Sequence, residues 1–150
     1  MIFIGIDPGL ISGAIGAIDH NGKFIYSGDI HAEDGRITFG RLKNQLLDCV
    51  NGQDAQIVIE DVHTMPGQGI ASSGRFMRAA GAIEAICFLT GTTHMVTPNR
   101  WKKDMGLDSE KSYGLEMARE LWPQAGLKLK KHHNKAEALL IAEWLRREFA

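Results

Sequence analysis

The sequence predicts an α/β fold with one mixed sheet and helices packed on its faces. Residues 2–6, 13–18 and 23–28 form three consecutive strand patterns, and Asn21-Gly22 is a tight-turn signal before the third. From residue 38 onward, helical and strand patterns alternate. Three leading strands followed by this alternation indicate a single mixed sheet with five strands in total, flanked by helices.

The later elements follow from apolar periodicity and from helix breakers. Ile57-Val58-Ile59 is typical of a buried central strand, and Pro123 ends a helix that Ser109 would cap. The expected elements are helix 38–50, strand 56–62, loop 63–71, helix 72–89, strand 93–97, short helix 99–105, helix 109–122, basic connector 124–131 and helix 133–149.

Length and composition predict a single globular domain over residues 1–150, because 44% of residues are hydrophobic and 23% are charged. Cys49 and Cys87 lack metal-ligand spacing, so we expect buried free thiols and a cytoplasmic protein. Asp7 interrupts the first apolar run, which argues against a signal peptide. No apolar stretch reaches membrane-spanning length, and no membrane association is expected.

The net charge of −1 hides an asymmetry along the chain. Residues 1–98 hold 6 Lys/Arg against 10 Asp/Glu, a net of −4, whereas residues 99–150 hold 11 against 8, a net of +3. The split is compatible with a basic surface near an acidic region, or with ordinary solvated helix faces.

Asp7 and Glu60 each stand where a predicted strand ends. Asp7 follows four apolar strand residues and precedes Pro-Gly, at the sheet edge where α/β proteins bind ligands; a turn-capping aspartate is the alternative. Glu60 lies within an apolar strand, where an unpaired carboxylate is costly and a cation would compensate; the alternative is a strand end that reaches solvent. Because side chains alternate along a strand, Asp61 should face away from Glu60.

Glu137 lies on the apolar stripe of the last predicted helix, four residues before Ile141. His133 and Asn134 precede it on the same side, and His132 lies about 140° away by helix geometry. Glutamate at a solvent-exposed helix start is the alternative interpretation. Three carboxylates from two strands and a helix could converge on hard cations. Two magnesium ions about 4 Å apart would suit phosphodiester hydrolysis.

Four segments of the chain together resemble RuvC-type Holliday-junction resolvases, in particular their phage and prophage members. These segments are Gly5-Ile6-Asp7-Pro8-Gly9, Val58-Ile59-Glu60, residues 72–86 with Gly74, Arg75 and Gly81, and Lys135-Ala136-Glu137-Ala138-Leu139-Leu140-Ile141-Ala142. The resemblance spans nearly the whole chain. It implies an RNase H-like fold, a homodimer and an endonuclease that resolves four-way DNA junctions by paired nicks.

The resemblance also implies specific site residues. Asp7, Glu60 and Glu137 match the family's metal-binding acids, with Mg²⁺ as the expected ion and Mn²⁺ as a substitute. The family's fourth position is commonly Asp and sometimes His, whereas this chain has His132-His133-Asn134 there. His133 is the first choice by helix geometry, as catalytic residue or metal ligand, and Asn134 is the second.

Basic and loop residues are candidates for contact with DNA. A small-residue helix at 72–89 is the expected dimer interface, and Trp101 is expected to be a core residue rather than a base-stacking one. The predicted DNA-binding residues are His63, Met65, Arg75, Arg78, Arg100, Lys102, Lys103, Lys111, Lys130, Lys131 and Lys135.

Three other functions remain compatible with the sequence. One is a nuclease for branched DNA in general or for RNA processing. Another is a junction-binding protein whose catalysis is weakened by the His/Asn replacement. Actin-like kinases share a similar strand opening, but their phosphate loops need a much longer chain. Nicking confined to synthetic junctions would favour the resolvase over all three.

Overall fold

The computed structural model describes residues 1–107 and 111–150, and it omits the side chains of Lys111 and Ser112. The predicted cap Ser109 and the side chain of Lys111 therefore lie outside the described residues. Within that part of the chain, no helix has both the length and the apolar character needed to cross a bilayer.

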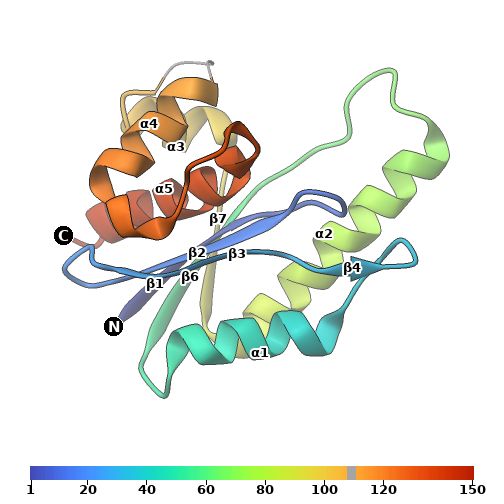
Figure 1. The fold of residues 1–150 in the computed structure, drawn as a ribbon. Helices are drawn as coiled ribbons and strands as arrows, with labels where there is room; N and C mark the ends of the chain where they lie inside the picture. Colours follow the sequence, from blue (N-terminus) through green and yellow to red (C-terminus); the bar gives the residue numbers. More distant parts are fainter. Residues whose placement is uncertain (108–110) are drawn as a thin grey trace.

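A five-stranded sheet in the order β3-β2-β1-β6-β7 forms the centre of the molecule (Figure 1). The opening three strands pair antiparallel as predicted. The later strands are parallel, with β6 paired to β1 and β7 paired to β6. The mixed five-stranded sheet expected from the sequence is therefore confirmed. The strands are β1 (Ile2–Asp7), β2 (Ala14–Asp19), β3 (Phe24–Asp29), β6 (Ala55–Glu60) and β7 (Thr92–Val96).

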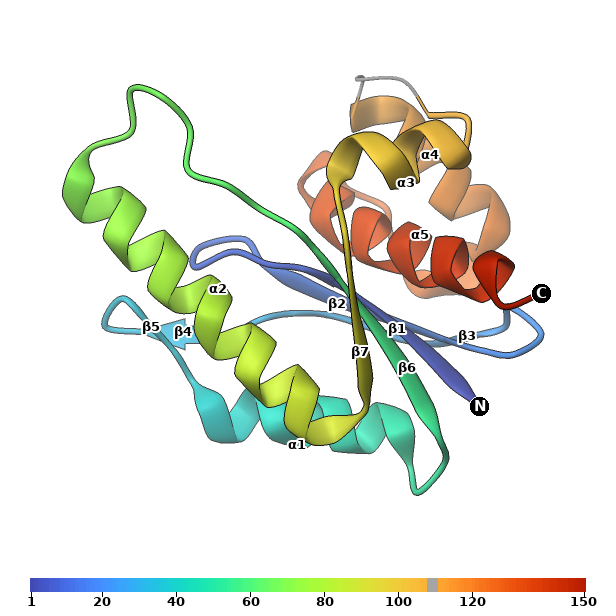
Figure 2. The same ribbon diagram turned by 180° about the vertical axis from the view of Figure 1, so that it is seen from behind.

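Helices cover both faces of this sheet, as Figures 1 and 2 show from opposite sides. One layer holds α1 and α2, and the other holds α5 with α3 and α4. The helices are α1 (Phe39–Val50), α2 (Ile70–Thr90), α3 (Pro98–Asp104), α4 (Lys111–Leu121) and α5 (His133–Glu148). The predicted connector 124–131 contains single 3-10 turns at Pro123–Ala125 and Lys130–His132.

Side chains alternate along β1 and β6 between two separate hydrophobic cores. Ile4 and Ile6 of β1 join the core under α1 and α2, whereas Phe3 joins the core under α5. On β6, Ile59 belongs to the core under α1 and α2, and Val58 belongs to the core under α5. This alternation decides which helical layer the last residue of each strand faces.

The helix α5 lies unusually close to β1 and β2. A Cβ atom at Gly5 would overlap the carbonyl oxygen of Ala138, and one at Gly16 would overlap the backbone of Leu139. Residues 138–145 are all buried because α4 covers the outer side of α5. The sequence predicted one apolar stripe on this helix, whereas α5 is buried on all sides over residues 138–145. The close contact fixes the height of Glu137, the neighbour of Ala138, above the sheet.

A small hairpin and the two cysteines complete the layer on the α1 side. The hairpin pairs β4 (Ala32–Glu33) with β5 (Arg36–Ile37), and the sequence analysis assigned no strand there. Cys49 and Cys87 are buried free thiols, as expected. Burial raises the pKa of both thiols to about 12, so they remain protonated at neutral pH.

Candidate active site

Asp7 and Glu60 end two neighbouring parallel strands. Ile6 of β1 is in register with Ile59 of β6, so the two acids that follow stand side by side at the same edge of the sheet. By the alternation of side chains, both belong to the α5 face. Asp61 comes after the strand, is 40% exposed and lies 3.7 Å from the imidazole of His63. Glu60 is therefore the buried acid of this pair and Asp61 the more exposed one, as the strand alternation predicted.

Glu60 is one of the two buried charged side chains in the described part of the chain, with 7% of its surface exposed. Its Oε1 accepts a hydrogen bond of 2.8 Å from the indole Nε1 of Trp101. Burial raises the pKa of this carboxyl above its ordinary value, and the charge of Glu137 raises it further. The Trp101 hydrogen bond and the charge of Lys102 act in the opposite direction.

Glu137 lies in the second turn of α5, close enough to Glu60 for the two charges to interact. The Nζ of Lys102 donates to Glu137 Oε1 at 2.9 Å, and both side chains are mostly buried. The same ammonium lies 5.2 Å from the ring centroid of Trp101. Two consecutive residues of α3 thus each bind one acid. Trp101 donates to Glu60 of β6, and Lys102 donates to Glu137 of α5.

Glu60 is thus near both other acids, Asp7 by strand register and Glu137 by charge interaction, but the three are not arranged as a metal site. Among the residues that the structure describes, no group of three His, Cys, Asp or Glu side chains is placed to hold an ion. Glu60 and Glu137 each accept from a protein donor, Trp101 for Glu60 and Lys102 for Glu137. The carboxylate oxygens are nevertheless the ligand type that magnesium prefers.

The candidates for the fourth position lie where α5 begins. His133 Nδ1 is 3.2 Å from the carbonyl oxygen of Lys130. The Nδ2 of Asn134 donates to the carbonyl oxygen of Ser12 at 2.5 Å, in the turn that follows Asp7. His132 Nδ1 accepts from the backbone N–H of Leu129 at 3.3 Å. Asn134 therefore ties α5 to the β1–β2 turn, a contact that the sequence did not reveal.

The predicted basic residues divide into paired and unpaired groups. Arg100 pairs with Glu148 and Asp104 and lies over Trp144, near the end of α5 remote from Glu137. Lys102 binds Glu137, and Lys135 lies 3.1 Å from Asp29. Among the described residues, the exposed basic candidates that form no ion pair are Lys103, Lys130, Lys131, Arg75 and Arg78.

The loop after Glu60 and the first half of α2 project away from the sheet (Figures 1 and 2). His63 and Met65 are exposed on this loop. Arg75 lines a large groove beside the β1–β2 turn, whereas Arg78 lines a separate small pocket near β5. The two arginines therefore do not serve one site.

Two roles near the acids were missed from sequence. Trp101 is fully buried, which confirms the expected core position, but its indole also holds Glu60. Lys102 was expected on DNA phosphates and instead binds Glu137 in this structure. No local pattern joins residues 41 or 35 positions apart, so neither contact had a sequence signal.

Comparison with known proteins agrees with the fold described above. No family model matches the chain. The Chlamydomonas reinhardtii protein "Holliday junction resolvase MOC1, chloroplastic" is 38% identical over 85 residues, which cover 53% of this chain. The chain spans about a tenth of the length of that relative, since the match covers 10% of it.

Solved structures match over almost the full length. Thermus thermophilus RuvC in complex with a Holliday junction substrate gives a TM-score of 0.72 at 16% identity, covering 99% of this chain and 96% of that one. A second Thermus thermophilus RuvC structure gives 0.69 at 18% identity, covering 99% and 97%. The expected resemblance to RuvC is therefore confirmed in three dimensions, and the chain has the RNase H-like fold of the RuvC proteins.

Proposed function

We propose that this protein is a structure-selective endodeoxyribonuclease that resolves four-way DNA junctions by metal-dependent hydrolysis of phosphodiester bonds. The observation that carries the proposal is the buried carboxylate of Glu60, which stands beside Asp7 at the strand ends and faces Glu137 of α5. A RuvC-type fold with this acidic edge supports the same function.

The donor set fits magnesium in chemistry. Asp7, Glu60 and Glu137 offer only carboxylate oxygens, and the mutual repulsion of Glu60 and Glu137 favours a cation between them. In this structure, Lys102 supplies positive charge beside Glu137. Magnesium, or manganese as a substitute, would supply an activated water and charge neutralisation at the phosphate when bound.

The chain's own residues have distinct tasks in this scheme. Asp7 and Glu60 are held at fixed spacing by the paired backbones of β1 and β6. Trp101 orients the Glu60 carboxylate through its indole N–H. Lys102 donates to Glu137 here, and its ammonium would be available for a DNA phosphate if Glu137 held a metal ion instead.

His133 and Asn134 are our candidates for the fourth position of the site. His133 begins α5 one turn before Glu137, where an imidazole could accept a proton from the attacking water. Asn134 holds the turn that follows Asp7. Replacement of His133 by Ala should slow nicking and alter its pH dependence, whereas Asn134→Ala should slow nicking without altering that dependence.

We propose a homodimer through the outer stripe of α2, because a two-fold junction requires two active sites. The exposed residues Ile70, Met77 and Phe88 follow one face of this helix, with open space above Gly74 and Gly81. Ala79, one of the small residues expected at the interface, is buried against the sheet instead. Met77→Glu should convert a sedimenting dimer into monomer, and an unchanged mass would place the interface elsewhere.

The decisive experiment is nicking of a synthetic four-way junction with and without magnesium. Asp7→Asn should abolish nicking while junction binding persists. Equal cleavage of junctions, flaps and RNA hybrids would favour the broader nuclease. Binding by the wild type without nicking would favour a weakened junction-binding protein, which the histidine and asparagine before Glu137 make a specific alternative.

A further inference from the structure

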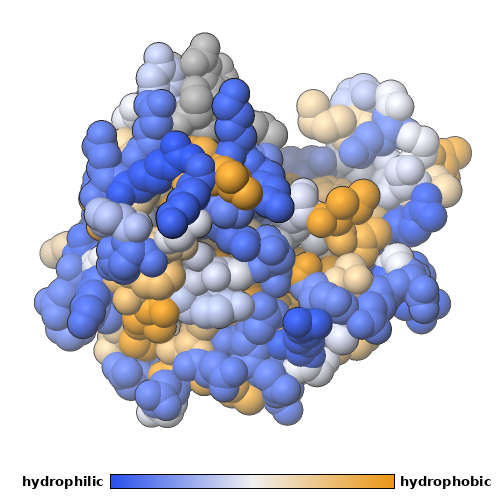
Figure 3. Space-filling view, viewed as in Figure 1, coloured by the Kyte–Doolittle hydropathy of each residue, from blue (hydrophilic) through white to orange (hydrophobic). Residues whose placement is uncertain are grey.

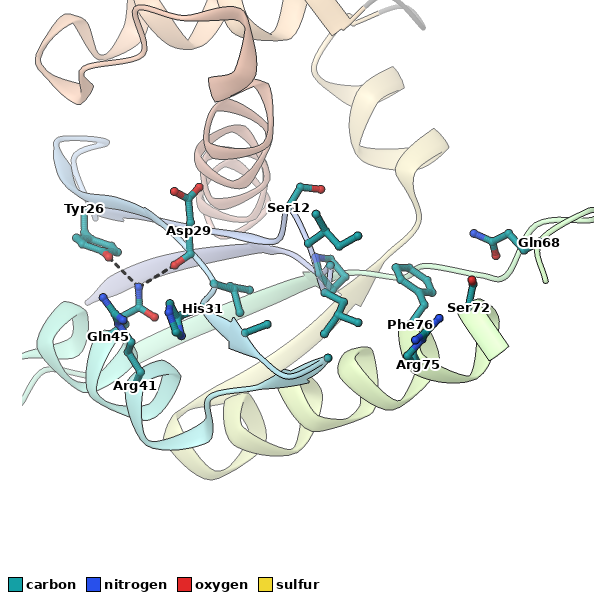
Figure 4. A pocket seen from close by; sticks show the side chains of 17 residues that line it. Ser12, Tyr26, Asp29, His31, Arg41, Gln45, Gln68, Ser72, Arg75 and Phe76 are labelled. Carbon is teal, nitrogen blue, oxygen red and sulfur yellow. Dashed lines mark hydrogen bonds between the residues drawn. The ribbon is translucent and has the colours of Figure 1, made fainter. Parts of the chain in front are cut away.

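A groove of about 1110 Å³ opens beside the acidic edge of the sheet. Its walls are the turn after β1, the segment from β3 to α1, and the first turns of α2 (Figure 4). The space-filling view also shows a hollow between the α3–α4–α5 layer and the projecting part of α2 (Figure 3). The volume slightly exceeds the roughly 300–1,000 Å³ typical of small-molecule pockets, so the groove has room for a short piece of polymer.

The groove carries uncompensated positive charge on opposite walls. Arg41 of α1 and Arg75 of α2 both line it, and neither guanidinium has an ion-pair or hydrogen-bond partner within residues 1–107 and 111–150. Its one acidic lining residue, Asp29, is already paired with Lys135 of α5. Two free guanidinium groups on opposite walls of an open groove suit phosphates of one strand.

Gln45 leaves a hydrogen-bond acceptor unsatisfied at one end of the groove. Its Nε2 donates to Tyr26 Oη at 2.9 Å and to the carbonyl oxygen of Asp29 at 3.1 Å. Because a carbonyl can only accept, this arrangement fixes the amide orientation. The Oε1 is buried and has no partner in the described part of the chain. A buried acceptor without a partner costs free energy, but this atom is closed to solvent and is therefore not a contact point for a ligand.

Apolar surface in the same groove offers places for flat rings. Phe76 is half-buried on the α2 wall, and Ile11, on the turn after β1, is 97% exposed. Aromatic and aliphatic side chains beside arginines are the usual components of a site for unpaired nucleotides. In duplex DNA the bases are stacked on one another and paired, so only a splayed base can lie against Phe76.

We propose that this groove binds an unpaired segment of the DNA strand beside the cleavage site. Arg41 and Arg75 contact its phosphates, and Phe76 supports a base. The proposal rests on the proposed function for its ligand, DNA, but not on the metal or on the chemical step.

The test is binding of a fluorescent four-way junction in EDTA, at several salt concentrations. Arg41→Gln should weaken binding roughly 3- to 10-fold and lower the slope of log K against log salt by about one, as expected for the loss of one phosphate contact. The matched control is Lys43→Gln, which removes an exposed charge from the same helix outside the groove and should alter neither quantity. Identical slopes for Arg41→Gln and wild type overturn the proposal.

A second measurement locates the strand directly. Junctions carrying 5-iododeoxyuridine at the crossover should crosslink to Phe76 or Tyr26, identified by mass spectrometry of the peptides. Crosslinks confined to residues outside the groove overturn the proposal, as does a dimer that dissociates on Arg41→Gln, because a second copy would then fill the groove. If the wild-type protein nicks junctions but the binding and crosslinking results contradict the groove, the proposed function still stands. If those results support the groove but the wild-type protein does not nick junctions, only the groove proposal stands.

Discussion

The two sides of the sheet differ in how their charged groups are satisfied. On the α5 side, Glu60, Glu137 and Glu143 are each bound by a side-chain donor. On the α2 side, Arg41 and Arg75 have no such partner among the residues that the structure describes, and Ile11 and Ile70 are almost fully exposed. A preorganised site holds its groups rigidly before the reaction, whereas a binding surface leaves its groups free for the ligand. We therefore propose that the α5 side carries the chemistry and that the α2 side adds further contacts to DNA.

The most severe test of this contrast replaces one acid on each side of β6. Glu60→Gln should lower the nicking rate at least about 100-fold, the usual scale for loss of a group that acts in the transition state. Asp61→Asn, one residue later and exposed, should remain within about threefold of wild type. Comparable losses in both variants would mean that the α5 face is not the reacting face.

The close contact between α5 and β1 predicts a large loss of stability on enlargement of Gly5. Gly5→Val must move the backbone of Ala138 and Ala142, and we expect at least about 3 kcal/mol from overpacking. The control Gly40→Ala, which meets nothing within 4 Å in α1, should be neutral or slightly stabilising. Urea unfolding of both variants measures the difference, and equal stabilities would contradict the close packing.

Glu143 offers a pH-dependent test of the paired side. Burial raises the pKa of this carboxyl, but hydrogen bonds from Arg146 and Arg147 more than offset it, so the pKa lies below the ordinary 4.5. Its stabilisation is therefore present above pH 4.5 and disappears as the pH falls through the lowered folded value. Glu143→Gln should cost about 1–3 kcal/mol at pH 7 and much less near pH 3.

The control for this pH series is Glu116→Gln, which removes an exposed carboxylate from α4. Its unfolding free energy should parallel that of the wild type at every pH. If Glu143→Gln also runs parallel to the wild type, the network with the two arginines does not stabilise the fold.

The smallest effect we predict concerns the ion pair between Lys102 and Glu137. Lys102→Met should lower the stability of the metal-free protein by about 1–2 kcal/mol, since a mostly buried carboxylate loses its cation. Manganese should then raise the melting temperature of the variant more than that of wild type, because no ammonium must be displaced. The exposed neighbour Lys103→Met is the control. Equal manganese shifts in Lys102→Met and wild type would show that the lysine does not compete with the ion.

The sequence predicted the strands, the helices and the inward direction of Glu60, because each depends on local patterns of apolar residues. It missed the β4–β5 hairpin, since two-residue strands are too short to show a period. Asp34 and Gly35 between them have positive φ angles of 48° and 70°, the backbone that a two-residue hairpin turn requires. Asp-Gly was thus a usable signal.

The candidate acids were also within reach of sequence analysis, through their strand ends and the family resemblance. Their partners were not. Trp101 was expected to pack in the core and Lys102 to bind DNA, because a sequence shows the type of a side chain but not what lies opposite it. The groove was missed for the same reason, since Arg41 and Gln45 belong to α1 whereas Phe76 belongs to α2.

The sequence alone determined the order of elements, the apolar faces that must be buried, and the acidic residues at two strand ends. Hydrophobic periodicity and turn chemistry are properties of neighbouring residues, so they can be read without coordinates. Tertiary structure alone decided that Lys102 neutralises Glu137 and that Gln45 keeps an unpaired acceptor beside two free arginines. Such contacts arise from the packing of elements distant in the chain, where distance and burial set the energy of every charge.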